Sequence, residues 1–192
     1  MSDTAVARGA LNPAAAVEGP GVRVAPRPPA AVVNLRGRLQ DAGFAEAVAG
    51  VLGAMPPAEP NTVASAGQLD LLWCGPDEWL VLAWQRGPED LTRGLVEALA
   101  GHHAAVTDVS AGNAVLELAG PGARALLARG CPLDLHPRVF APGRCAQSVL
   151  GHAGVLIHLR DPQPAFTVVV RRSMAGYLWR WLDVMSARLP QP

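Results

Sequence analysis

The sequence predicts an α+β protein in which two antiparallel sheets are backed by helices. Short apolar strands alternate with a few segments of helical periodicity, and the order β-α-β-β-β-α-β is followed by β-α-β-β-β-α. Each half resembles a split βαβ unit of the ferredoxin-like kind with one extra strand. The chain has 192 residues, enough to bury a core without disulfides, so we expect a single compact unit of two ferredoxin-like halves.

The first half is expected to hold strands at 31–36, about 61–66, 69–74, 79–84 and about 104–109. Its first helix follows apolar residues at helical spacing from Phe44 to Leu52. Its second helix is predicted to begin at Pro88, because proline is favoured at the first helical position. Glu89 and Asp90 then lie in the first turn, where the helix dipole favours acids.

The second half is expected to hold strands at 113–118, near 145–150, at 154–160 and at 166–171. A short helix is predicted after Gly120-Pro121, and an irregular stretch runs from Cys131 to Gly143. The final helix is expected to begin after Ser173 as N-cap and to bury an apolar stripe that ends at Met185.

Residues 1–30 are expected to form a flexible Ala/Pro-rich arm before a folded domain at 31–190. This stretch is mostly Ala, Pro, Gly and Val with five prolines, and it follows neither helical nor strand periodicity. It also lacks an unbroken apolar segment of signal-peptide length. With three cysteines in no short paired spacing, the expectation is a soluble protein of the reducing cytoplasm.

The charged residues exclude several function classes. Sixteen basic and sixteen acidic side chains give a net charge of zero, which argues against a nucleic-acid surface. Every basic residue is arginine, so a Schiff-base lysine and a phosphate-loop lysine are excluded. Only 17% of residues are charged, against roughly 25% in typical soluble domains. We therefore expect part of the surface to be covered by a partner.

One group of residues has the side chains that zinc requires. Cys131, His136, Cys145 and His152 are spaced C-x4-H-x8-C-x6-H, which matches no compact zinc signature. Cys131 and His136 with Asp134 could also form a nucleophilic set, but nucleophile sites are normally assembled from distant segments. The favoured interpretation is that His136 and Asp134 satisfy the backbone of an irregular loop. We predict no catalytic, cofactor-binding or metal residue on this chain.

Two further features have structural and interaction interpretations. Gly120-x-Gly122 lies between a strand and a helix but lacks the third glycine of the dinucleotide fingerprint, so a structural role is favoured.

Trp179 lies at the edge of the final helix's apolar stripe beside Arg180. Because Trp and Arg are enriched at interface hot spots, Trp179 is an interface candidate, although core packing is the default for tryptophan. The other interface candidates are Arg171, Arg172 and His136.

Several segments together resemble the gamma subunit of heterotetrameric sarcosine oxidase. They include Leu72-Trp-Cys-Gly-Pro-Asp-Glu-Trp-Leu80, Gly130-Cys-Pro-Leu-Asp-Leu-His-Pro137 and Arg171-Arg-Ser-Met-Ala-Gly-Tyr-Leu-Trp179, and the similarity spans about residues 32–185. The resemblance implies a fold similar to the folate-binding aminomethyltransferase. It also implies a non-catalytic subunit of a flavoprotein that oxidatively demethylates sarcosine to glycine.

The resemblance further implies the chemistry of the complex. The products are glycine, hydrogen peroxide and either formaldehyde or 5,10-methylenetetrahydrofolate, and FAD, FMN, NAD and zinc are expected on partner subunits. The partners would be the large flavin-binding and small subunits of the heterotetramer. An alternative is a stand-alone tetrahydrofolate-binding or aminomethyltransferase-like module, in which Asp108 or Glu117 would pair with the pterin ring.

Overall fold

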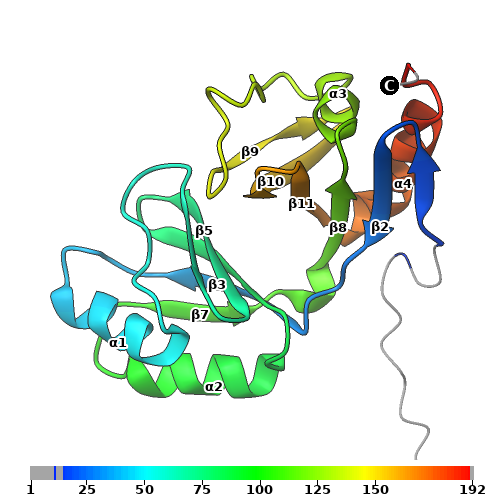
Figure 1. The fold of residues 1–192 in the computed structure, drawn as a ribbon. Helices are drawn as coiled ribbons and strands as arrows, with labels where there is room; N and C mark the ends of the chain where they lie inside the picture. Colours follow the sequence, from blue (N-terminus) through cyan, green and yellow to red (C-terminus); the bar gives the residue numbers. More distant parts are fainter. Residues whose placement is uncertain (1–10, 12–14, 191–192) are drawn as a thin grey trace, which may run out of the picture.

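The computed structural model describes Leu11 and residues 15–190, and its backbone forms two antiparallel sheets with helices on their outer faces (Figure 1). The six-stranded sheet has the order β1 (Val17–Gly19), β2 (Val22–Pro26), β8 (Asn113–Ala119), β11 (Ala165–Arg171), β10 (Ala153–Asp161), β9 (Cys145–Leu150). The five-stranded sheet has the order β4 (Val63–Ala66), β5 (Leu69–Gly75), β6 (Glu78–Ala83), β3 (Ala31–Arg36), β7 (Ala105–Asp108). The predicted fold class is confirmed.

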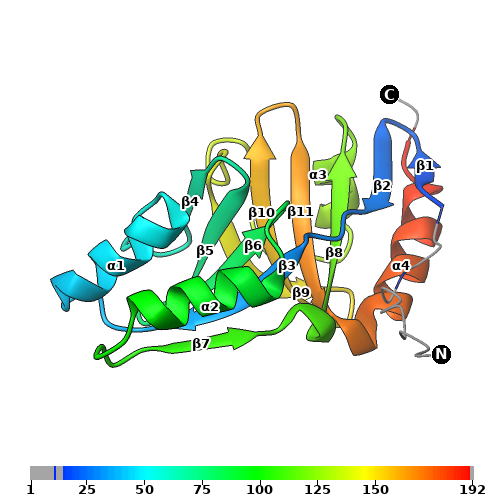
Figure 2. The same ribbon diagram turned by 90° about the horizontal axis from the view of Figure 1, so that it is seen from below.

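Helices α1 (Ala42–Leu52) and α2 (Pro88–Ala98) cover the outer face of the five-stranded sheet, as Figure 2 shows. Their apolar faces pack on alternate strand residues, since every second side chain of a strand points to the same face. Phe44 of α1 lies with its ring centroid 5.8 Å from that of Trp79 of β6, and the Trp79 indole N–H donates to the carbonyl of Pro57 at 2.9 Å.

Helices α3 (Ala123–Ala128) and α4 (Arg172–Ser186) pack against the six-stranded sheet on its side away from the other sheet. Leu178 and Leu182 of α4 are fully buried there. Helix α4 starts at Arg172 with Arg171 as its N-cap residue and no side-chain cap. The expectation that Ser173 caps this helix is therefore wrong, because β11 passes directly into α4.

The first two strands lie within residues 1–30, for which the sequence predicts a flexible arm, so the folded part begins before residue 31. β1 and β2 form a hairpin, and β2 pairs with β8, so residues before Ala31 extend the six-stranded sheet. The hairpin turn lies against Gly120 and Gly122. A Cβ atom on Gly120 would lie 2.4 Å from the carbonyl oxygen of Gly21, so glycine allows this close backbone approach. Residues 1–10 and 12–14, which belong to the predicted arm, lie outside the described residues.

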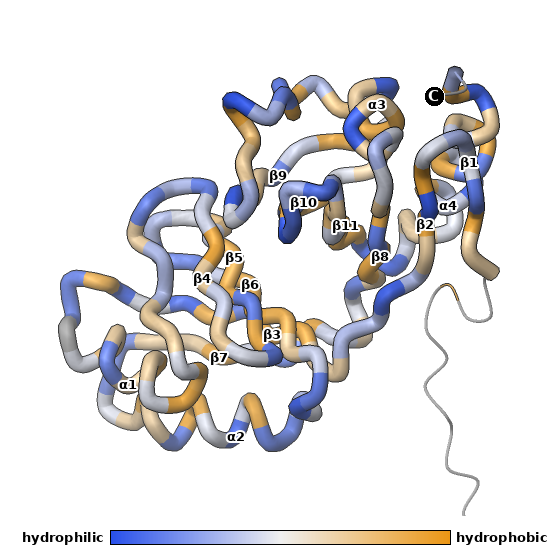
Figure 3. Tube along the Cα trace, in the orientation of Figure 1, coloured by the Kyte–Doolittle hydropathy of each residue, from blue (hydrophilic) through white to orange (hydrophobic). Residues whose placement is uncertain are grey.

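The two sheets meet through their inner faces. An apolar layer joins them, formed from the five-stranded sheet by Val32, Leu72, Leu80 and Leu82 and from the six-stranded sheet by Val115, Cys145, Leu156 and Val169. Figure 3 shows hydrophobic residues concentrated on β3, β5 and β6. None of the helices in the described ranges is both long and apolar enough to cross a membrane.

Candidate functional site

The residues that face the inner layer between the sheets change in polarity along each strand. β8 places Glu117, Val115 and Asn113 on its inner face in that order, and β10 places His158 and then Leu156 there before Gly154. Because these positions are two residues apart, each strand gives a polar, an apolar and again a polar or open position. The inner layer therefore has a charged end, an apolar middle and an open end.

At the charged end, carboxylates and arginines neutralise one another. Glu117 forms ion pairs with Arg160 and, at 3.5 Å, with Arg27. The Arg27 guanidinium lies 3.7 Å above the centre of a Trp84 ring. Burial is the main cause that lowers the pKa of Arg27, and the nearby positive charge of Arg160 acts in the same direction. Trp84 in turn donates its indole N–H to Asp70 at 2.9 Å. This end closes the inner layer with paired charges.

His158 is a buried titratable group of the charged end. Its side chain is 3% exposed, and its Nδ1 has no hydrogen-bond partner within the described structure. Burial lowers its pKa to about 4, and the positive charges of Arg160 and Arg27 act in the same direction against the opposing effect of Asp70. His158 is therefore neutral at neutral pH.

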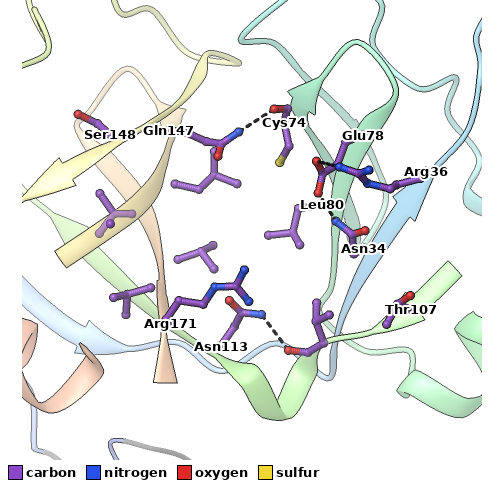
Figure 4. Close-up of a pocket in the computed structure, with 16 residues that line it drawn as sticks. Asn34, Arg36, Cys74, Glu78, Leu80, Thr107, Asn113, Gln147, Ser148 and Arg171 are labelled. Carbon is purple, nitrogen blue, oxygen red and sulfur yellow. Dashed lines mark hydrogen bonds and ion pairs between the residues drawn. The ribbon is translucent and has the colours of Figure 1, made fainter. Parts of the chain in front are cut away.

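The open end is a pocket of about 580 Å³ lined by both sheets, a volume within the usual range of small-molecule sites. Its floor is the apolar layer, with Leu80 on one side and Leu156 and Val169 on the other. Figure 4 shows the polar side chains around this floor. Across the rim, the Gln147 amide of β9 donates to the carbonyl of Cys74 of β5 at 2.7 Å, which ties the two walls together.

One wall of the pocket carries Glu78, a carboxylate whose two oxygens both accept hydrogen bonds. Glu78 accepts from Arg36 at 2.5 Å through Oε2 and from the Asn34 amide at 2.7 Å through Oε1. The hydrogen bond from Arg36 is the main cause that holds the pKa of Glu78 below its usual range. Both carboxylate oxygens are engaged, so Glu78 and Arg36 add no net charge to the pocket.

The opposite wall carries Arg171, whose side chain extends from the end of β11 toward the middle of the pocket (Figure 4). Its charge contributes to the lowered pKa of Glu78 across the pocket, yet none of the carboxylates described in the structure forms an ion pair with it. Cys74 also lines the pocket, and burial raises the pKa of its thiol to about 11. The thiol is therefore protonated and a weak nucleophile.

The four residues with zinc-ligand side chains are not brought together. Cys131 is buried in the outer core of the six-stranded sheet, whereas Cys145 is buried in the inner layer on the other side of that sheet. His136 and His152 are exposed. Within Leu11 and residues 15–190, no group of three or more His, Cys, Asp or Glu side chains is arranged to hold a metal ion.

The Cys131, Asp134 and His136 segment is held by its own loop. Asp134 accepts from the backbone N–H of His136 at 2.9 Å, and the His136 ring accepts from the backbone N–H of Arg138 at 3.2 Å. The Cys131 thiol lies 3.6 Å from the hydroxyl of Ser148. These contacts are those expected of residues that satisfy an irregular loop.

The interface candidates lie on different parts of the molecule. Trp179 is partly buried and packs against the outer core of the six-stranded sheet. His136 lies in the loop between α3 and β9, and the neighbouring Leu135 packs in that same outer core. Arg172 begins α4, whereas Arg171 lines the inner pocket. The structure therefore separates Arg171 from the other candidates.

The two acids considered for a pterin ring also have structural partners. Glu117 pairs with the arginines of the charged end. Asp108 accepts from the backbone N–H of Ser110 at 2.9 Å and from its hydroxyl at 2.5 Å, which closes the turn after β7. Neither acid lines the pocket.

Sequence reasoning missed two groups of residues at this layer. They are the pocket residues Asn34, Arg36 and Glu78 and the buried pair Asp70 and His158. Asp70 lies between Leu69 and Leu71, and His158 lies between Ile157 and Leu159. A polar residue inside an apolar strand is the available signal, because strand alternation then places it on one face among apolar neighbours. The sequence alone does not show that the inner faces of two sheets meet.

The fold is similar to that of part of an aminomethyltransferase. The glycine cleavage system aminomethyltransferase T from Bartonella henselae superposes with a TM-score of 0.66 at 13% identity, over 86% of this chain and 46% of that one. A chain of the heterotetrameric sarcosine oxidase from Corynebacterium sp. U-96 superposes with a TM-score of 0.80 at 31% identity, over 89% of this chain and 87% of that one.

The sequence comparisons identify the family. The model of the sarcosine oxidase, gamma subunit family matches residues 36–188. Sarcosine oxidase subunit gamma from Arthrobacter sp is 38% identical over 158 residues, which cover 80% of this chain and 75% of the relative. The subunit from Corynebacterium sp. (strain P-1) is 35% identical over 164 residues, which cover 83% and 78%. This chain belongs to the sarcosine oxidase gamma subunit family.

Proposed function

We propose that this chain serves as the non-catalytic gamma subunit of a heterotetrameric sarcosine oxidase and supports assembly and the one-carbon transfer region. Membership of the gamma subunit family carries the proposal, together with the superposition on a chain of the Corynebacterium heterotetramer. The non-catalytic role is also supported by Asp134 and His136, the two candidates for a nucleophilic set with Cys131, because both side chains accept hydrogen bonds from the loop backbone. The enzyme class would be an oxidoreductase that acts on CH–NH donors with oxygen as acceptor.

The partners of the chain are then the other subunits of the heterotetramer, with FAD, FMN, NAD and zinc on those subunits and the complex in the cytoplasm. This assignment follows from the family resemblance. Visible absorption spectra and metal analysis of separately purified subunits test it, because a flavin spectrum or bound zinc on this chain alone would contradict it.

Co-expression tests the assembly. The chain should purify with the large subunits in a fixed stoichiometry, and omission of the chain should reduce the yield of active tetramer. A fully assembled and active sarcosine oxidase obtained without this chain would refute the proposal. Calorimetry of the isolated chain with tetrahydrofolate tests the less favoured stand-alone module, for which saturable binding at micromolar concentration is required.

The proposed contact surface includes the outer side of α4 with Trp179 and Arg172, and the exposed loop of His136. Trp179→Ala should weaken assembly by about 2 kcal/mol if this residue is an interface hot spot. Because Trp179 also packs against the outer core, urea unfolding of the isolated variant measures the cost to the fold. Equal losses in the two measurements would place Trp179 in the core rather than at the interface.

A further inference from the structure

The pocket at the open end contains one charge that the described structure leaves without a counter-charge. Arg36 and Glu78 pair with each other, and Asn34 occupies the second oxygen of Glu78. Arg171 faces them from the opposite wall. The polar lining therefore offers a ligand one guanidinium with a net charge of plus one, and no carboxylate remains available to bind a cation.

The remainder of the lining indicates the polarity of the ligand. Leu80, Leu156 and Val169 form an apolar floor that would favour an apolar body. The Asn113 amide lies beside Arg171 and donates to the carbonyl of Val109 at 2.8 Å, so its position is fixed. A planar guanidinium matches a carboxylate through two parallel hydrogen bonds.

We propose that this pocket binds a small organic monocarboxylate with an apolar body, whose carboxylate pairs with Arg171 and whose body lies on the apolar floor. The pocket walls come from two sheets that are joined beneath by the apolar layer and tied at the rim by Gln147 and Cys74. Such walls are formed before the ligand arrives, which lowers the entropic cost of binding. The proposal does not depend on assembly with other subunits.

Titration calorimetry of the full chain tests this proposal with 2-naphthoate as the probe. Its uncharged analogue 2-naphthamide has nearly the same shape, and inorganic phosphate has charge without an apolar body. We expect saturable binding of 2-naphthoate, with naphthamide and phosphate at least about tenfold weaker, because a charge-assisted bidentate contact is lost in one case and apolar burial in the other. Equal binding of 2-naphthoate and naphthamide, or no saturable binding, would overturn the proposal.

Two variants locate the site. Arg171→Gln should weaken 2-naphthoate binding about tenfold or more, whereas Arg172→Gln, its neighbour outside the pocket lining, should stay within about twofold. Gly154→Leu should abolish binding by filling the pocket. Gly154 lines the pocket and a Cβ atom there meets no heavy atom within 4 Å, so the fold should tolerate the substitution.

An amide NMR spectrum shows whether each variant remains folded and where the probe lies. The side-chain amide signals of Asn113 and Gln147 should shift during titration with 2-naphthoate, because both residues line the pocket. If Arg171→Gln failed to fold, Gly154→Leu and the naphthamide comparison would still decide the question. Unchanged affinity in a folded Gly154→Leu variant would refute the site.

Discussion

The two polar ends of the inner layer differ in how their charged side chains are paired. At the charged end, Arg27 and Arg160 share Glu117, and the side chains of these three residues are only 24–30% exposed. At the open end, Arg36 and Glu78 pair at 51% and 29% exposure, while Arg171 faces the pocket. Ion pairs that are largely withdrawn from water are costly to break, and exposed pairs contribute little. The comparison indicates that the charges of one end neutralise one another within the six-stranded sheet, whereas the other end leaves Arg171 available to a ligand.

The largest expected difference between the ends comes from removal of each carboxylate. Glu117→Gln leaves Arg27 and Arg160 together without their shared counter-charge and should cost about 3 kcal/mol of unfolding free energy. Glu78→Gln is the matched change at the open end and should cost about 1 kcal/mol or less. Urea unfolding at neutral pH measures both. Similar losses would show that the two ends do not differ in the way described.

The charged end should also make the fold sensitive to acid. His158 has a pKa of about 4 in the folded chain, against an ordinary value of 6.5. The unfolded chain therefore binds more protons between these pH values, and stability falls as the pH falls. From pH 7 to pH 5 the contribution of His158 to this loss is about 2 kcal/mol.

His158→Gln should flatten that pH dependence, because the substituted side chain does not titrate. The groups around His158, which are Asp70, Arg160 and Arg27, are retained in this variant. Urea unfolding of both proteins at several pH values between 7 and 5 gives the comparison. An unchanged slope in His158→Gln would assign the acid sensitivity to another group.

The smallest expected effect concerns the hydrogen bond across the open end. Gln147→Ala removes the bond to the carbonyl of Cys74 and should cost about 1 kcal/mol. Gln85→Ala changes an exposed glutamine outside the pocket lining and is the control, with an expected cost near zero. If Gln147→Ala also left stability unchanged, the bond would not hold the pocket walls together.

Much of the fold could be predicted from the sequence because the signals are local. The strand at 31–36 and the helix start at Pro88 have the predicted bounds in the structure, since apolar alternation and proline position act over a few residues. Cys131 and Cys145 lie on opposite sides of the six-stranded sheet, and their spacing along the chain does not indicate this separation. The family resemblance, drawn from short segments, is confirmed by the comparisons.

The pocket could not be predicted, because it depends on contacts between distant segments. Asn34 and Glu78 are 44 residues apart, and Gln147 and Cys74 are 73 residues apart. Strand alternation indicates that Glu78 shares a face with Leu80 but not which sheet that face meets. Arg171 was predicted as an interface residue from its sequence context, and only the meeting of two inner faces places it in a pocket.

By itself the sequence determined the α+β class, the order of helices and strands after residue 30 and the likeness to the gamma subunit family. Periodicity, turn chemistry and short segments are properties of neighbouring residues, so they can be read along the chain. The tertiary structure alone decided that β1 and β2 join the sheet of the second half and that the inner layer has one charged and one open end. These features arise from pairing and burial between residues far apart in the chain, and the free energy that fixes them is gained only when the two sheets pack.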